Sequence, residues 1–221
     1  GALLMVGLMK YCRKQPMPWV ALTVAVPYLI CVVAMGYTRQ AVALGFLLWG
    51  LSILRVGSER KFIGLIFLGS LFHQSLIVTL PFIFFSGKKY FWWHFLLFGI
   101  LLIGGIYYLI SVLELFLIYR AIIDFYLGTH SAGAAVRAYM NVLPIFLSLF
   151  FWRRIKRISP DYTIIKWMSI AALLALPLLS VSTTFVDRLG LYLMPLQVAL
   201  WPRLVAVQST MFMRSVWASM V

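Results

Sequence analysis

The feature that most constrains this chain is a series of long apolar runs separated by short clusters of basic residues. A helix needs about 20 apolar residues to cross the hydrocarbon core of a membrane, and several of these runs approach that length. Only 11% of the 221 residues are charged, whereas a soluble domain has about 25% charged residues. The sequence therefore predicts an all-α, polytopic helical membrane protein with one transmembrane domain over residues 1–221.

The formal charge of +14 does not indicate nucleic-acid binding, because lysine and arginine fall in short clusters between the apolar runs. Cytoplasmic loops of membrane proteins show this pattern. Cys12 and Cys31 lie in a basic loop and inside an apolar run, and the three histidines lack the spacing of a metal site. We therefore expect no nucleic-acid partner, no metal site and no cofactor.

Both ends of the sequence lie within apolar segments, and no signal peptide precedes the first of them. We therefore expect the chain to be an internal part of a longer protein, with further helices upstream, while further helices downstream are left open. Near the other end, an apolar run over 191–201 is bracketed by Pro195 and Pro202. The hydropathy pattern after residue 201 is too ambiguous to predict a further element.

The run from Lys61 to Lys89 decides on which side of the membrane the later loops lie. It is apolar from Phe62 to Phe85, has basic residues at both ends, and carries His73 near its middle. If every run crossed the membrane, the basic cluster 153–157 would face away from the other basic clusters. That arrangement violates the charge bias of cytoplasmic loops. One segment that does not cross restores the agreement.

We favour a re-entrant hairpin over residues 62–85, with His73 at its tip and facing a cavity ringed by external arginines. Two half-helices of about 11 residues would each reach only halfway across the hydrocarbon core. The alternative is a break of the run 95–113 at Gly104-Gly105, which leaves Lys88 and Lys89 outside. An ionisable side chain at such a depth is a functional-site hypothesis by default.

Four arginines fall on the external side under either topology, against the charge bias that orders the rest of the chain: Arg39, Arg120, Arg137 and Arg188. The planar guanidinium suits the oxygens of carboxylates and phosphates, so we expect anion binding. Arg39 follows Thr38, a good helix N-cap, and would stand in the first turn of a helix. The alternative for Arg39 is a side chain that reaches lipid headgroups. The alternative for Arg120 is an ordinary solvated loop, because Glu114 and Asp124 lie near it in the sequence.

Three of the remaining polar residues share helix faces with these arginines, and His73 stands apart from them. Arg137, Asn141 and Ser148 are spaced i, i+4 and i+11, which favours one polar face, with interhelical hydrogen bonding as the alternative. Arg188 and Tyr192 are spaced i and i+4, and Asp187 could neutralise Arg188 in a plain structural pair. His73 could act as a general base or as a donor to a phosphate or sugar hydroxyl. Its alternative is a histidine that is hydrogen-bonded between helices.

Short motifs in a fixed order resemble the EpsG family of bacterial exopolysaccharide polymerases, which are related in role to Wzy O-antigen polymerases. The motifs are Tyr37–Ala41, Phe72–Ser75, Val136–Pro144, Thr184–Tyr192 and Pro195–Gln197. The similarity extends from about Lys10 to Trp201. The family usually has further upstream helices and an external loop with acidic and aromatic residues, which are absent from this sequence. A catalytic carboxylate in that loop would lie outside the chain.

The resemblance implies a multi-pass enzyme of the bacterial inner membrane with a GT-C-like fold. It would join undecaprenyl-pyrophosphate-linked repeat units by glycosyl transfer at the external face, without a metal ion. His73 and Arg39 would be catalytic. The substrate-binding residues would be Arg137, Asn141, Arg188, Tyr192, Arg120 and Gln40. The expected partners are the lipid-linked glycan, membrane lipids, a chain-length regulator and a flippase.

Two other functions remain open at this point. The first is a different enzyme on the same lipid carrier, such as a glycan ligase or a lipid-linked-sugar glycosyltransferase. The second is a transporter of lipid-linked oligosaccharides, which should show inverted repeats and matching broken helices in two halves. The sequence has one candidate broken segment and no partner for it. The sequence does not specify the sugars, the linkage, the stereochemical outcome or the oligomeric state.

Overall fold

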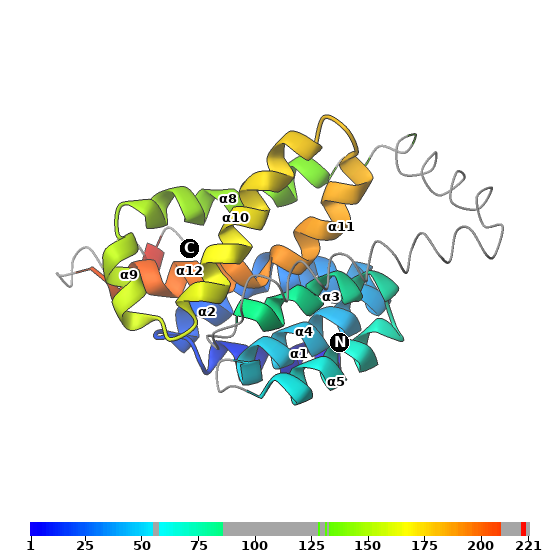
Figure 1. Cartoon of the computed structure of the whole chain (residues 1–221), viewed down its shortest axis with the longest axis horizontal. Helices are drawn as coiled ribbons and strands as arrows, with labels where there is room; N and C mark the ends of the chain where they lie inside the picture. Colours follow the sequence, from blue (N-terminus) through cyan, green and yellow to red (C-terminus); the bar gives the residue numbers. More distant parts are fainter. Residues whose placement is uncertain (55–57, 86–127, 129–130, 132, 209–217, 220–221) are drawn as a thin grey trace.

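The structure is a computed structural model that describes residues 1–54, 58–85, 128, 131, 133–208 and 218–219. Within these residues every regular element is helical, which confirms the predicted all-α class (Figure 1). The elements are α1 (Ala2–Cys12), α2 (Pro18–Ala25), η1 (Val26–Val33), α3 (Ala34–Gly36), α4 (Thr38–Leu54), α5 (Glu59–Ser70), η2 (Gln74–Phe85), α8 (Ala134–Leu149), α9 (Trp152–Ile158), α10 (Tyr162–Leu178), α11 (Thr183–Leu193) and α12 (Pro195–Ala206).

One helical stretch in the described part is long and apolar enough by itself to cross a membrane, Pro18–Gly36 with 19 residues. Its middle is a π-helix that contains Pro27, whose missing N–H cannot join the usual hydrogen-bond ladder. Two bent pairs raise the number of candidate spans to at most three: α8 with α9, bent by 96°, and α11 with α12, bent by 50°. The chain is therefore an all-α membrane protein.

Close helix packing in the first half depends on glycines. The backbones of α1 and α4 touch at Gly7 and Gly45, where a Cβ on either residue would collide with the main chain of the other helix. Small residues at such crossings let membrane helices pack by van der Waals contact, since lipid supplies no hydrophobic driving force between them. Fully buried leucines of α1 and α4 surround this crossing, including Leu4, Leu44 and Leu48.

The hairpin predicted around His73 has a counterpart in the structure. Helix α5 ends at Ser70, the chain bends over residues 71–73, and η2 packs against α5, α4 and α10. The close approach of Gly69 to side chains of Leu76 and Phe46 marks the bend. The break therefore lies where the sequence predicts it. Lys88, Lys89 and the alternative break at Gly104-Gly105 lie outside the described residues.

The structure places the tip of the hairpin beside one end of α4. His73 contacts Gln40 in the first turn of α4, so the tip lies beside the beginning of that helix and not at half its height. The reason is that α5 runs along nearly the whole length of α4, as the contact of Gly50 near one end with Phe62 shows. The tip therefore belongs to one end of the helix bundle.

Polar side chains gather at the two ends of the bundle. At the His73 end, α4 begins beside the bend, and Arg137 near the start of α8 reaches Tyr37. At the opposite end, which we call the Arg203 end, the loop after α1 meets the loop before α10. The basic segments 10–14 and 153–157 adjoin these two loops, so they share one end, as the charge argument requires.

Candidate functional site

His73 lies at the centre of a small hydrogen-bonded cluster. Its Nε2 is 3.1 Å from Gln40 Nε2, and its Nδ1 is 2.6 Å from Ser75 Oγ and 3.0 Å from Tyr192 Oη. Ser75 Oγ and Tyr192 Oη are also 3.1 Å apart. His73 is half-buried, so the imidazole is not sealed from the surface. The cluster joins the bend, the first turn of α4 and the last turn of α11.

Local sequence explains how these side chains meet. His73 and Ser75 are two residues apart in the sequence, and the bend brings the Ser75 hydroxyl to Nδ1 of the His73 ring. Helix α4 begins at Thr38, one position earlier than an N-cap role for Thr38 requires, and Gln40 follows in its first turn. Such a one-residue difference lies within the usual variation in helix assignment. Ser182 caps α11 by accepting a hydrogen bond from the Phe185 N–H, and Tyr192 lies near the other end of that helix.

The cluster can hold either neutral form of the imidazole. With the proton on Nδ1, the ring donates to Ser75 Oγ, and Nε2 accepts from the Gln40 amide. With the proton on Nε2, the Gln40 side chain turns its carbonyl oxygen toward the ring, and Nδ1 accepts from the hydroxyl of Ser75 or Tyr192. His73 can therefore exchange a proton without losing its place.

Arg137 forms a second cluster at the same end. Its Nε donates to Tyr28 Oη, its Nη1 pairs with the carboxylate of Asp187, and its Nη2 donates to Tyr37 Oη at 3.3 Å. The guanidinium carbon lies 5.7 Å and 5.4 Å from the centres of the Tyr28 and Tyr37 rings. The Arg137 side chain is 9% exposed, and the Asp187 side chain 17%. Arg137 therefore joins η1, α8 and α11 to the turn before α4.

Arg188 and Asn141 have different surroundings. Arg188 lies four positions before Tyr192 on α11, which puts the two side chains on one face of the helix that contacts His73. Asn141 is 1% exposed, its Nδ2 donates to the Gly190 carbonyl at 2.9 Å, and its Oδ1 accepts from Gln197 Nε2 at 3.1 Å. The position of Asn141 matches the alternative of interhelical hydrogen bonding. It braces α8 against α11 and α12.

Two predicted arginines remain. Arg39 is exposed in the first turn of α4, and no described residue makes a hydrogen bond or ion pair with its guanidinium. Arg120 lies outside the described residues. The structure thus brings His73, Gln40 and Tyr192 into contact, places Arg188 near them, and locates Arg39 one residue from Gln40 on the same helix turn.

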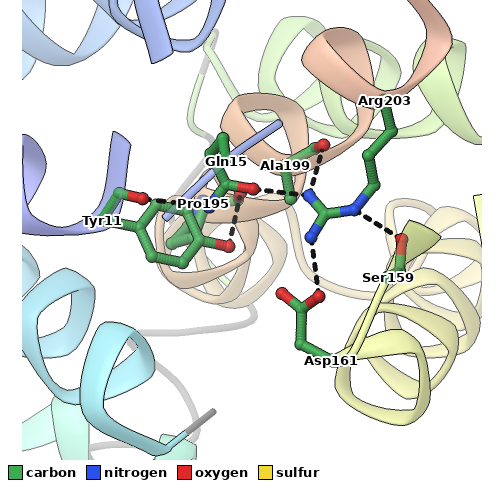
Figure 2. A network of polar contacts seen from close by, with 7 residues as sticks. All are labelled: Tyr11, Gln15, Ser159, Asp161, Pro195, Ala199 and Arg203. Carbon is green, nitrogen blue, oxygen red and sulfur yellow. Dashed lines mark hydrogen bonds and ion pairs between the residues drawn. The ribbon is translucent and has the colours of Figure 1, made fainter. Parts of the chain in front are cut away.

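A third polar cluster, at the Arg203 end, was not predicted (Figure 2). Arg203 is fully buried, its Nε donates to Ser159 Oγ at 2.7 Å, and its Nη2 pairs with Asp161 at 2.6 Å. Its Nη1 donates to Gln15 Oε1 at 2.5 Å and to the Ala199 carbonyl at 2.7 Å. Asp161 is one of only five acidic residues in the chain, and that scarcity is the signal that could have pointed to it.

Sequence reasoning also missed Ser75, Tyr28 and Tyr37 as partners of predicted residues. Each is a hydroxyl on an apolar or motif-bearing stretch, and only the fold shows which basic group it meets. Among the described residues, no group of three or more His, Cys, Asp or Glu side chains could hold a metal ion.

Comparison with known proteins adds one decisive finding. The model of the EpsG family matches residues 2–219, nearly the whole chain. The chain belongs to the EpsG family. No curated protein and no solved structure matches it. The predicted GT-C-like resemblance of the fold therefore stays a prediction, while the family assignment made from the motifs is confirmed.

Proposed function

We propose that this EpsG-family chain forms part of a polysaccharide polymerase of the bacterial inner membrane. The substrate would be an oligosaccharide repeat unit linked to undecaprenyl pyrophosphate, and the reaction would take place at the external face. The family assignment supports a role in polysaccharide polymerisation. The observation that carries the proposal is the position of His73, which is half-buried, hydrogen-bonded on both ring nitrogens and in contact with Tyr192, one helical turn after Arg188 on α11.

In this reaction a hydroxyl oxygen of the acceptor glycan bonds to the anomeric carbon of the donor, and the bond from that carbon to the pyrophosphate oxygen breaks. The hydroxyl proton passes to His73, which acts as general base, a role that typically accelerates a reaction by about 10²–10⁴-fold. The Ser75 and Tyr192 hydroxyls bond Nδ1 and so hold the ring while Nε2 faces Gln40.

The departing pyrophosphate gains negative charge, and fixed cations near it stabilise that charge in the transition state. Arg188 stands one helical turn before Tyr192, which contacts His73, and Arg39 stands exposed directly before Gln40. We assign leaving-group stabilisation to these two residues. Arg137 is already paired with Asp187 and bonded by two tyrosines, so its proposed role is to hold the wall of the site and not to grip the phosphate.

The test is reconstitution of the full-length protein in vesicles with a lipid-linked repeat unit. The proposal predicts glycans of two or more repeats together with one released lipid pyrophosphate for each bond formed. Transfer of the glycan to a different acceptor would indicate a ligase, and movement of the intact lipid-linked glycan across the bilayer without new bonds would indicate a transporter. Either result would contradict the proposal.

A further inference from the structure

We propose that α9 and the start of α10 form a binding surface for the headgroups of anionic phospholipids at the Arg203 end. Helix α9 turns away from α8 by 96° and exposes four basic side chains, Arg153, Arg154, Lys156 and Arg157. Its Ile155 is fully buried and packs in a cluster with Leu204 and Val207. A short helix with one apolar anchor and a basic outer face is typical of a segment that lies in the membrane interface.

This basic face is held in place before any lipid binds. Arg203 fixes the loop after α9 through Ser159 Oγ at 2.7 Å and Asp161 at 2.6 Å. At the start of α9, Trp152 Nε1 donates to Tyr162 Oη at 2.8 Å, and Lys156 Nζ lies 5.3 Å from the centre of the Tyr162 ring. Because both ends of α9 are tied to the bundle, the backbone that carries its cations would lose little conformational freedom when they bind a phosphate.

Tryptophans mark the depth of this surface. Trp167 on α10 is 41% exposed, and Trp19 at the start of α2 is 79% exposed. Lys166 is exposed next to Trp167, and its Nζ lies 5.9 Å from the ring. Tryptophan concentrates at the boundary between membrane and water, where its ring sits at the level of the headgroups. Basic residues at that level face lipid phosphates directly, which favours a lipid over a soluble acidic protein as the occupant.

Charge complementarity determines the kind of lipid. A basic residue near an anionic membrane surface raises the binding constant about fivefold, and the exposed cations of α9 act together at one place. Zwitterionic headgroups offer no net charge to such a surface. The expected ligand is therefore a phospholipid with a net negative headgroup.

The probe is phosphatidylglycerol, titrated into the detergent-purified full-length protein and followed by native mass spectrometry, with phosphatidylcholine of the same acyl chains as reference. The test variant replaces Arg153, Arg154, Lys156 and Arg157 by Gln. The control variant replaces Arg13, Lys14, Arg60 and Lys61 by Gln, which removes the same charge from exposed residues of other segments.

We expect wild type to prefer phosphatidylglycerol, and the α9 variant to bind the first phosphatidylglycerol about tenfold or more weakly. The control variant should lose less than a third of that effect, and both variants should keep the wild-type melting temperature. Equal affinity of wild type and the α9 variant for phosphatidylglycerol would overturn the proposal and leave an acidic protein as the candidate occupant. Equal weakening in both variants would also overturn it, because the effect would then follow total charge and not α9.

Discussion

Two buried arginines, Arg203 and Arg137, lie at opposite ends of the bundle and differ in how their charge is compensated. Arg203 has a fully buried side chain and a partner carboxylate that is 4% exposed, and its Nε, Nη1 and Nη2 all donate to protein acceptors. Arg137 is 9% exposed, and its partner Asp187 is 17% exposed. Its other partners are tyrosine hydroxyls, and Tyr37 is 40% exposed.

The comparison separates a structural cluster from the margin of a site. A buried ion pair is costly to assemble, and it becomes very costly when one partner is removed. Arg203 joins the loop after α1, the loop before α10 and α12, and four of its five N–H donors bond protein acceptors. Arg137 stands at the same end as His73, beside the half-buried ring of Tyr28 and the exposed ring of Tyr37. Burial of a charge therefore does not by itself indicate function, whereas a partly exposed polar neighbourhood can.

The largest expected effect concerns the two faces of the membrane. In a background with Cys12→Ala and Cys31→Ser, the single variants Arg13→Cys and Arg157→Cys should be labelled by an impermeant thiol reagent from one side of the membrane. The single variant Arg39→Cys should be labelled from the other side. Arg13 and Arg157 adjoin the Arg203 cluster, and Arg39 lies at the other end. Labelling of all three from the same side of intact vesicles would contradict the division into two ends.

The next effect is on stability. Arg203→Met should lower the free energy of unfolding by about 3–5 kcal/mol, because the buried Asp161 carboxylate loses its ion pair with Arg203. Denaturation of the detergent-solubilised protein measures this change. The double variant Arg203→Met with Asp161→Asn should recover part of the loss. A loss below 1 kcal/mol for the single variant would show that the cluster is not a structural tie.

Arg137→Met should destabilise less, by about 1–3 kcal/mol, because the Asp187 side chain is 17% exposed, against 4% for Asp161. Arg137→Met should shorten the polymer more than Arg203→Met does, since η1, α8 and α11 lose their common partner at the edge of the proposed site. The same denaturation assay and an electrophoretic ladder of glycan lengths measure the two effects. If Arg137→Met matched Arg203→Met in stability and made polymer of normal length, the proposed contrast would be wrong.

Tyr192→Phe should give the smallest effect in this series. It removes one of two hydroxyls near His73 Nδ1, and Ser75 Oγ remains at 2.6 Å. A single neutral hydrogen bond contributes about 0.5–1.5 kcal/mol, which corresponds to a fall in turnover of about two- to twelvefold. Turnover of Ser75→Ala with Tyr192→Phe should fall by more than the product of the two single effects, because the ring then loses every described partner of Nδ1. Simple multiplication of the single effects would argue against a shared role.

Much of this architecture could be predicted from the sequence. The long apolar runs predict the helical membrane class, and the basic ends of the run 61–89 with His73 at its centre predict the break that the structure places there. The motif order predicts the family. The position of the hairpin tip along α4 was not predictable, because it depends on how far α5 overlaps α4, and hydropathy carries no information on that overlap.

The sequence also could not predict which acidic residue pairs with which arginine. Asp187 adjoins Arg188 in the chain, yet the structure shows it in an ion pair with Arg137 of another helix. Arg203 lies after Pro202, where the apolar pattern gives no further element, but Pro202 falls inside α12 and the helix carries Arg203 into the bundle. Contacts between residues more than 40 positions apart, such as Arg203 with Asp161, arise from packing and leave no local pattern.

The most direct test of the central claim is the single-turnover rate of His73→Gln with the lipid-linked repeat unit. Gln keeps a hydrogen-bonding side chain but cannot take a proton, so the account predicts a rate about 10²–10⁴-fold below wild type with nearly unchanged substrate affinity. Gln74→Ala, an exposed neighbour at the same bend, serves as control and should keep the wild-type rate. A wild-type rate for His73→Gln would contradict the account and make His73 a packing residue.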